Sequence, residues 1–338
     1  MFEGNKSCWC SSSSSRDLKI VVLLGLLFSP TCTLAQDHRF SQFAHRAWKT
    51  RDGFFSGSAQ AVTQTNDGFI WIGTDSGLYR FDGSRFELWS SPDGQKLPSS
   101  QIIALLGASD GSLWIGMEGG LAHFADRKLF VYPGFHDDVG GLLQDRNGKI
   151  WFTRSEAGGA LTVPICQALP TKIHCLDQTD GVTATSCCSY RLSQDAEGYL
   201  WVTTEGPLLR WKPGHSETYL PSGWKGTKGI ETALCAVGMP DGSVLVCVGR
   251  TGAFGGLQKL SKGRWEAVKV PGFDGSQVPA FSAFPDKEGG IWVGTIKGIC
   301  RIQGNGFEAF GKEDGVTGDA NGFFRIARMA SGWPLPAA

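Results

Sequence analysis

The sequence predicts an all-β protein, a β-propeller of four-stranded antiparallel blades, and three observations support this fold class. A turn built on Gly recurs six times, and an apolar position three residues after each Gly holds Trp in five of the six copies. These positions are 37 to 50 residues apart, which is the length of one propeller blade. The chain contains 47 Gly, which suits many tight turns, and no stretch combines helical periodicity with helix caps. The six positions are Trp71, Trp114, Trp151, Trp201, Leu245 and Trp292.

The first repeat shows how one blade is built. Residues 58–65 alternate around small apolar side chains and predict the first strand, and the turn Asn66-Asp67-Gly68 follows because Gly supplies the positive φ that a tight hairpin needs. Residues 69–74 are nearly all apolar, so this second strand is expected to be covered on both faces. Residues 78–81 and 85–89 predict the third and fourth strands. Four antiparallel strands in about 43 residues make one propeller blade.

An incomplete seventh blade is expected at the ends of the chain. A seventh turn Gly is present at Gly332, Ile326 lies six residues before it, and the Trp position falls on Leu335. Residues 38–48 predict a fourth strand without a blade of its own, and an outer strand from the N-terminus can close a propeller ring. We therefore expect the propeller to span residues 38–338 and to lack the middle strands of this blade, as in a chain that is cut short.

Residues 1–35 predict a secretory signal peptide. A basic flank at Arg16 precedes a short apolar run from Ile20 to Phe28, and small residues lead to Ala35, where we expect cleavage. A membrane anchor is the alternative, but about nine apolar residues are too few to span a bilayer. The protein is therefore expected to be periplasmic or exported, and membrane-anchored only if the signal peptide is retained.

Seven of the ten Cys residues remain after cleavage, and export permits disulfides. The third blade is the irregular one, because its predicted third strand, residues 159–162, runs into a longer segment that carries four Cys. Either Cys166 with Cys175, or the Cys187-Cys188 pair, could bridge this segment. No spacing repeats as Cys-x-x-Cys, which argues against a metal site. Buried free thiols are at least as well supported as disulfides for the other three residues, Cys235, Cys247 and Cys300.

The repeated Trp has two interpretations. Exposed aromatic rings form a stacking platform for a base or a sugar, whereas buried rings fill the wedge between neighbouring blades. The residues beside the Trp position are apolar, which favours the second interpretation. We therefore expect these Trp residues to belong to the architecture and not to a binding site.

Charge and motifs argue against several classes of function. The chain has 32 basic and 32 acidic residues, so it lacks the basic footprint of a nucleic-acid-binding protein. No phosphate-binding loop of the form G-x-x-x-x-G-K-[ST] is present. The six His residues share no phase of the repeat, and the one candidate fragment of a metal site, His136-Asp137-Asp138, is expected to be a solvated loop. We predict no catalytic residue, no cofactor and no bound metal.

The repeat from Asp67 to Gly83 reads Asp-Gly-x-x-Trp-Ile-Gly-Thr-x-x-Gly-Leu-x-Arg-Phe-Asp-Gly and closely resembles the two-component regulator propeller repeat. The resemblance covers essentially all of residues 38–332. In that family the repeats form exported sensor propellers, usually two rings in tandem, followed by a small β-sandwich, a transmembrane helix and a histidine kinase. The resemblance implies a sensor domain that binds an extracellular cue, commonly derived from saccharides, and passes the signal through the membrane.

No kinase domain is recognisable in this sequence, so we expect a protein that binds and does not phosphorylate. The kinase region would then belong to a longer or separate chain, and a homodimer is compatible with this role. One alternative is a metal-dependent propeller enzyme of the lyase type, which needs His and acidic residues around a metal on the central channel. Another is a nonfunctional truncated remnant.

The ligand-binding residues of the expected sensor are unknown from the sequence. Ligand contacts are expected on loops at one face of the ring, where aromatic residues outside the repeat positions are candidates. Each of these is more often explained by simple loop packing. The candidates are Phe54, Phe55, Phe135, Trp224 and Phe273.

Overall fold

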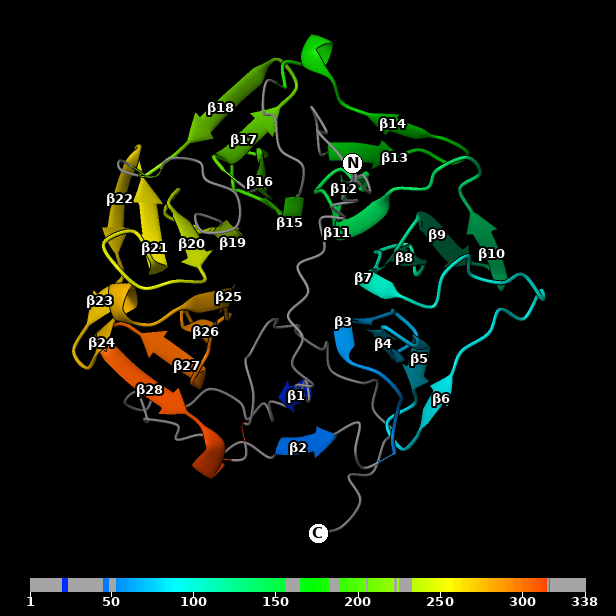
Figure 1. Ribbon diagram of the computed structural model, residues 1–338, viewed down its shortest axis with the longest axis horizontal. Helices are drawn as coiled ribbons and strands as arrows, with labels where there is room; N and C mark the ends of the chain where they lie inside the picture. Colours follow the sequence, from blue (N-terminus) through cyan, green and yellow to red (C-terminus); the bar gives the residue numbers. More distant parts are fainter. Residues whose placement is uncertain are drawn as a thin grey trace, which may run out of the picture.

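The computed structural model describes residues 20–23, 45–48, 53–155, 165–182, 189–204, 206–221, 224, 233–314 and 316. Within these residues the chain forms six four-stranded antiparallel sheets, which surround a central axis as the blades of a propeller (Figure 1). The predicted all-β propeller is therefore confirmed. In the described part of the chain the only helices are short 3-10 turns, and none is long and apolar enough to cross a membrane.

The strands of the six blades follow one another along the chain. Blade 1 contains β3 (Ala59–Gln64), β4 (Ile70–Thr74), β5 (Gly77–Phe81) and β6 (Phe86–Leu88). Blade 2 contains β7 (Ile102–Gly107), β8 (Leu113–Met117), β9 (Gly120–Ala125) and β10 (Lys128–Val131). Blade 3 contains β11 (Asp138–Gln144), β12 (Ile150–Ser155), β13 (Ile165–Ala168) and β14 (Ile173–Cys175). Blade 4 contains β15 (Ser189–Gln194), β16 (Leu200–Thr204), β17 (Leu208–Lys212) and β18 (His215–Tyr219). Blade 5 contains β19 (Ala233–Gly238), β20 (Val244–Val248), β21 (Gly256–Ser261) and β22 (Arg264–Ala267). Blade 6 contains β25 (Ala280–Pro285), β26 (Ile291–Thr295), β27 (Gly298–Gln303) and β28 (Gly306–Phe310).

Short elements lie between the blades. A two-residue hairpin of β23 (Lys269–Val270) and β24 (Phe273–Asp274) joins blade 5 to blade 6. The 3-10 turns are η3 (Gln178–Asp180), η4 (Gly275–Gln277) and η5 (Lys312–Asp314).

The order of the strands gives the ring two different faces. In each blade the first strand lies nearest the axis and the fourth lies at the rim (Figure 1). The hairpins between first and second strands, and between third and fourth strands, therefore reach one face, which we call the turn face. The connections between second and third strands, and the links from one blade to the next, reach the opposite face, which we call the link face.

The buried second strands explain why the repeats assemble into a ring. Every residue of β4, β8, β16 and β20 is buried, because both faces of these sheets are covered. Neighbouring blades provide this cover, and in blade 1 one face packs against Trp48 and Phe55 instead. The outer strands β6 and β18 contain exposed residues, as expected at the rim. In blade 1 each strand begins and ends within one residue of its predicted bounds.

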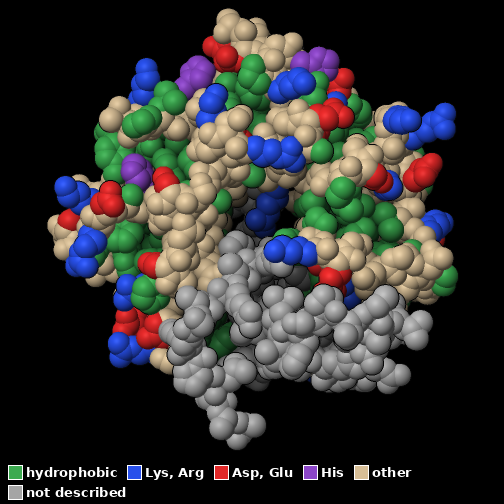
Figure 2. All heavy atoms as spheres, turned by 180° about the vertical axis from the view of Figure 1, so that it is seen from behind, with side chains coloured by type: hydrophobic (Ala, Val, Ile, Leu, Met, Phe, Trp, Pro, Cys, Tyr) green, Lys and Arg blue, Asp and Glu red, His purple; other side chains and the backbone are tan. Residues whose placement is uncertain are grey.

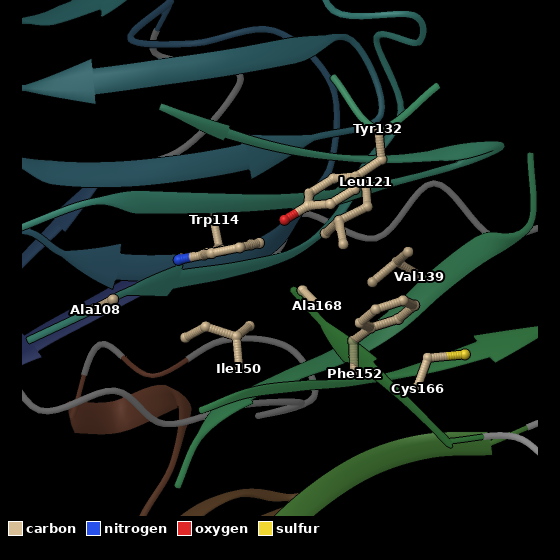
Figure 3. Packing of buried hydrophobic residues seen from close by; sticks show 9 residues of the cluster. All are labelled: Ala108, Trp114, Leu121, Tyr132, Val139, Ile150, Phe152, Cys166 and Ala168. Atoms are coloured by element: carbon tan, nitrogen blue, oxygen red, sulfur yellow. The ribbon is translucent and has the colours of Figure 1, made fainter. Parts of the chain in front are cut away.

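The Trp positions lie between blades, as the sequence predicts. The five Trp residues are 3 to 8% exposed, and Leu245 in the sixth copy is 2% exposed. Figure 3 shows the interface between blades 2 and 3, where Trp114 belongs to one buried cluster with Ile150 and Phe152 of the next blade. The hydroxyl group of Tyr132 crosses the same interface and donates a hydrogen bond of 2.7 Å to the carbonyl oxygen of Leu169.

The N-terminal strand lies beside the first blade. β2 (His45–Trp48) is placed between blade 6 and blade 1 (Figure 1), within the range predicted for an unpaired fourth strand. It pairs antiparallel with β1 (Ile20–Leu23), which belongs to the predicted signal peptide. Trp48 is 7% exposed, and its ring centroid lies 5.2 Å from that of Phe81 in blade 1. The predicted C-terminal strand around Ile326 and Leu335 lies outside the described residues.

The third blade differs from the prediction in its third strand. The predicted strand at residues 159–162 lies outside the described residues, and the third strand of the sheet is β13. A disulfide joins Cys166 of β13 to Cys175 of β14, which are directly opposite each other, so the first of the two predicted alternatives is confirmed. The Cys187-Cys188 pair lies outside the described residues.

For the remaining three Cys residues, the sequence left disulfides and free thiols open, and the structure contains both. Cys235 and Cys247 form a disulfide, because β19 and β20 pair in a register that places them directly opposite each other. Cys300 is a buried free thiol, as expected, and burial raises its pKa to about 12. Repeat phase alone could not reveal the disulfide, since a Cys is also a common small apolar core residue.

Candidate functional site

On the turn face, the indole groups of the repeated Trp are held by polar side chains. In blades 3, 4 and 6 the indole nitrogen donates to an Asp located six residues before the Trp. The distances are 2.9 Å for Trp151 and Asp145, 2.9 Å for Trp201 and Asp195, and 3.1 Å for Trp292 and Asp286. In blade 1 the hydroxyl group of Thr65 takes the same role at 2.8 Å. The sequence analysis missed these acceptors, although Asp recurs at one phase of three repeats.

Two of these Asp residues also bind an Arg from the third strand. Arg210 lies opposite Trp201, and its Nη2 is 3.1 Å from Oδ2 of Asp195. Arg301 lies opposite Trp292, and its Nη2 is 2.8 Å from Oδ2 of Asp286. Because the same constellation occurs in two blades, we interpret it as part of the repeat and not as an active site.

Glu217 extends this network in blade 4 and makes the stability of that blade sensitive to acid. Hydrogen bonds from Tyr219, His215 and Arg210 hold the pKa of Glu217 at about 2, below its ordinary value of 4.5. Because the pKa is lower in the folded state, Glu217 stabilises the fold above about pH 4.5, and this contribution is lost as the pH falls from 4.5 towards 2.

The acid sensitivity of Glu217 can be measured by replacing the residue. We expect the free energy of unfolding of Glu217→Gln to fall less steeply than that of the wild type between pH 5 and about pH 3, in urea titrations at each pH. The control is Glu266→Gln, an exposed residue on β22, which should follow the wild type. Identical acid profiles for Glu217→Gln and the wild type would contradict the assignment.

Hydrogen bonds between neighbouring blades also lie on the turn face. The Asn66 side chain donates to the carbonyl oxygen of Ser109 at 2.9 Å, and the amide nitrogen of Ser109 donates to the side chain of Gln144 at 2.8 Å. The amide nitrogen of Arg146 donates to the side chain of Gln194 at 3.0 Å. The turn face of blades 1 to 4 is thus joined by repeated structural contacts, which leaves the link face and the central opening as places for a ligand.

The five candidate aromatic residues all lie on links between blades, hence on the link face, but they form no common site. Phe55, Trp224 and Phe273 are 4, 7 and 6% exposed. Trp224 and Phe273 pack into clusters between blades, and Phe55 packs with Trp48 against blade 1. Phe135 packs edge-on against Phe152, with 5.5 Å between ring centroids. Phe54 is 36% exposed. Four of the five thus contribute to the core, in agreement with the expectation of simple loop packing.

The first, innermost strand of every blade contains a shift in its pairing register. Each of them shifts its register near its start, so that the strand has at least one residue more than its partner there. The residue ten positions before the Trp position lies within or directly after this shift and is small in five of the six blades. The six residues are Ala61, Ala104, Gly141, Arg191, Cys235 and Ser282.

Arg191 is the exception in this layer. The equivalent Ala104 and Cys235 are each 7% exposed, whereas Arg191 is exposed to solvent. It is the only Lys or Arg on the six innermost strands. Figure 2, a view from behind, shows a central opening with Lys or Arg side chains in and around it. Sequence analysis missed this residue, although aligning the repeats by phase would have shown one Arg among small residues.

The candidate metal fragment is occupied by contacts within the protein. Nη1 of Arg154 lies 2.7 Å from Oδ2 of Asp137, and Asp138 accepts a hydrogen bond of 2.8 Å from the amide nitrogen of Gly119. In the described ranges no group of three or more His, Cys, Asp and Glu side chains is placed to hold a metal ion. His123, on β9, stacks on Trp114 with 4.7 Å between ring centroids.

Comparisons with solved structures identify propellers. Virginiamycin B lyase from Staphylococcus aureus is 15% identical with a TM-score of 0.55, and the match covers 75% of this chain and 84% of that one. The extracellular domain of BT4673 from B. thetaiotaomicron, described as a hybrid two component system, is 17% identical with a TM-score of 0.54. That match covers 74% of this chain and 36% of the BT4673 domain, so this chain spans about a third of it.

A third similar structure is PorZ from Porphyromonas gingivalis, a bacterial surface component of the type-IX secretion system. It is 16% identical with a TM-score of 0.55, and the match covers 80% of this chain and 44% of PorZ. At these identities the structures support the fold alone. No curated protein matches the chain.

One repeat also matches a family model. The model is described as "Two component regulator propeller", and it matches residues 96–119, which include the first two strands of blade 2 up to the end of β8. The match is independent of the repeat from Asp67 to Gly83 that first indicated the resemblance. The resemblance is thus confirmed, and the chain is a propeller similar to the two component regulator propellers.

Proposed function

We propose that this chain is the exported, ligand-sensing propeller of a two-component signal transduction system. It binds an extracellular cue derived from a saccharide, and the kinase that reads the cue belongs to a longer or separate chain. The observation that carries the proposal is the match of one repeat to the two component regulator propeller model. Residues 1–35 would direct export as a cleaved signal peptide, and the two disulfides are compatible with an oxidising compartment.

The geometry favours the central opening, approached from the link face, as the place where the cue binds. The turn face repeats the same Trp and Asp contacts in several blades, and a repeated contact gives no reason for one ligand to prefer one blade. Arg191 breaks the repeat at the axis and brings a guanidinium group to a position where the other blades have small side chains. A guanidinium group donates several hydrogen bonds in a fixed plane, which suits hydroxyl and carboxylate oxygens of a sugar.

This proposal is tested by thermal unfolding with a panel of neutral and acidic oligosaccharides. A ligand of the native state is expected to raise the Tm by mass action, by an amount that grows with its concentration. Arg191→Ala should abolish the increase, whereas Lys149→Ala, an exposed basic residue on the turn face, should retain it. If no saccharide raises the Tm, or if both variants respond like the wild type, the proposed cue or its location is wrong.

The second candidate function is a metal-dependent lyase, which the similarity in fold to virginiamycin B lyase supports. Mass spectrometry of a cyclic peptide antibiotic incubated with the protein would detect cleavage. Cleavage that stops on chelation would favour the enzyme over the sensor. A chain that does not purify as a folded species would favour the third alternative, a nonfunctional remnant.

A further inference from the structure

In every blade one residue of the third strand lies directly opposite the Trp position. It is basic in five of the six blades, but only His123 in blade 2 changes its charge near neutral pH. The six residues are Arg80, His123, Gln167, Arg210, Lys259 and Arg301. Blade 2 therefore has a titratable group at a position where the other basic blades carry a permanent charge.

The carboxylate that pairs with this residue in other blades is also missing from blade 2. In blades 4 and 6 the Arg binds the Asp located six residues before the Trp. In blade 5, Nζ of Lys259 lies 2.8 Å from Oδ2 of Asp241. In blade 2 the position of the Asp six residues before the Trp is held by Ala108, which is 1% exposed. Nδ1 of His123 is buried and has no hydrogen-bond partner.

The His123 ring belongs to the contact between blades 2 and 3. It is half-buried, and its centroid lies 4.7 Å from that of Trp114, on which it stacks. The rings of Phe130 and Tyr132 follow at 5.3 and 6.0 Å. Trp114 and Tyr132 are part of the buried cluster that joins the two blades (Figure 3). A movement of His123 therefore acts on the aromatic rings that hold blade 3.

Protonation changes what the His123 ring requires of its surroundings. A neutral imidazole carries one N–H group, whereas a protonated one carries an N–H group on each nitrogen. Because Nδ1 is buried without a partner, its new N–H group has no acceptor. Burial lowers the pKa of His123 from its ordinary value of 6.5, and the negative charge of Asp110 opposes this effect only in part.

Among the described residues, Asp110 is the only charge that acts on the His123 ring. Oδ1 of Asp110 is already occupied by the amide nitrogen and the hydroxyl group of Ser112. Tyr132 is neutral, because burial raises its pKa to about 12. Asp145 of blade 3 accepts from the indole nitrogen of Trp151. The other charged residues of β10 and of the turn-face hairpins of blade 3, together with the tip of the β9–β10 hairpin, are exposed; they are Asp126, Arg127, Lys128, Arg146, Lys149 and Lys172.

We propose that His123 makes the contact between blades 2 and 3 responsive to protons. The neutral ring stacks on Trp114 and supports the contact. The protonated ring must leave this stack to reach an acceptor, which loosens blade 2 from blade 3. Because the pKa of His123 is lower in the folded state, its contribution to stability is complete above about pH 6.5 and is lost as the pH falls through the folded-state pKa. This device goes beyond the proposed function and is tested without a ligand, so either can fail while the other stands.

The wild-type protein gives the first test, an NMR titration from about pH 8 to pH 5 with the His123 signal assigned through its backbone. The midpoint for His123 is expected below 6.5. The 15N-labelled indole group of Trp114 should shift with the same midpoint, because the two rings are stacked. A midpoint at or above 6.5, or a Trp114 signal that does not follow it, would overturn the proposal.

The second test is His123→Gln, which gives blade 2 the residue that blade 3 has at this position, Gln167. Between about pH 7.5 and pH 5.5 the wild type should lose free energy of unfolding that the variant keeps. Each unit by which the pKa of His123 lies below 6.5 corresponds to a loss of about tenfold in the folding equilibrium constant. The control is His136→Gln, an exposed residue between blades 2 and 3, which should follow the wild type. Identical pH profiles for His123→Gln and the wild type would overturn the proposal.

Hydrogen exchange followed by mass spectrometry locates the effect in the ring. At about pH 5.5, peptides from β9 to β12 should exchange faster in the wild type than in His123→Gln, because the protonated ring loosens this contact. Peptides from β25 to β28 serve as the internal control and should exchange at equal rates in both proteins. Equal changes in all blades would indicate a general effect of acid and would contradict a device in blade 2.

Ala108→Asp restores the carboxylate that blades 4 and 6 have at this position. In those blades the Asp pairs with the basic residue opposite the Trp, so the pKa of His123 is expected to rise in the variant. The same NMR titration measures the midpoint. If the folded variant titrates like the wild type, the missing carboxylate does not set the response, and the proposal is wrong.

Discussion

Replacing Trp201 with Ala is expected to lower the free energy of unfolding by about 3–5 kcal/mol. Trp201 is 4% exposed and lies between blades 4 and 5, in one cluster with Val244, Val246 and Val248. Its removal leaves a cavity between two sheets whose backbones are held by their own ladders, so the blades cannot close over it. Urea unfolding followed by circular dichroism measures the change.

The control for this prediction is Trp265→Ala on β22 at the rim of blade 5. Trp265 is only partly buried, so its loss creates no closed cavity and should cost distinctly less than the loss of Trp201. Equal costs at the two positions would show that the repeated Trp is not the main contact between blades. Trp201→Phe, which keeps most of the ring volume, should fall between the wild type and Trp201→Ala.

Replacing Asp195 with Ala is expected to cost about 3 kcal/mol or more. Asp195 is 6% exposed and accepts hydrogen bonds from the Trp201 indole at 2.9 Å and from the backbone of Tyr199 at 2.9 Å. It also pairs with Arg210. The substitution therefore leaves two buried N–H donors without their acceptor. It also removes one of three carboxylates that pair with Arg210, which keeps Glu197 and Glu217.

Two further variants separate the charge from the hydrogen bonds in this prediction. Arg210→Met combined with Asp195→Ala should cost less than the sum of the single changes, because each single change already removes the ion pair between these two residues. Thr65→Val in blade 1 removes only the hydroxyl group that accepts from Trp71 and should cost about 1 kcal/mol. Additive costs for Asp195 and Arg210 would contradict the coupling.

The spacing of Trp71 and its equivalents was enough to predict the six blades, because one large residue is required wherever two sheets meet. The strands of blade 1 could be placed to within one residue for the same reason. The third strand of blade 3 could not, since residues 159–162 fit the pattern equally well and only pairing with β12 selects β13. The disulfide of Cys235 and Cys247 likewise depends on the pairing register of β19 and β20, which cannot be derived from the amino-acid composition.

The candidate site was less accessible from the sequence than the fold. Trp224 was among the aromatic candidates, but only coordinates show that its ring is buried between blades 4 and 5. Arg191 was available in principle as an Arg at a phase otherwise held by small residues.

The small residues near the axis set how much sequence change each part of the ring tolerates. A Cβ atom added to Gly73 would lie 2.5 Å from Cγ2 of Ile102 in the next blade, and one added to Gly116 would lie 2.6 Å from Cγ1 of Val139. Such neighbours cannot move apart without opening the whole ring. In propellers of this kind, the range of side-chain sizes tolerated at a position should therefore increase with its distance from the central axis. It should be narrowest near the axis and widest at the rim. New binding specificity is then expected to arise in longer connections between strands, such as residues 249–255 between β20 and β21. It is also expected at rare large residues near the axis, such as Arg191.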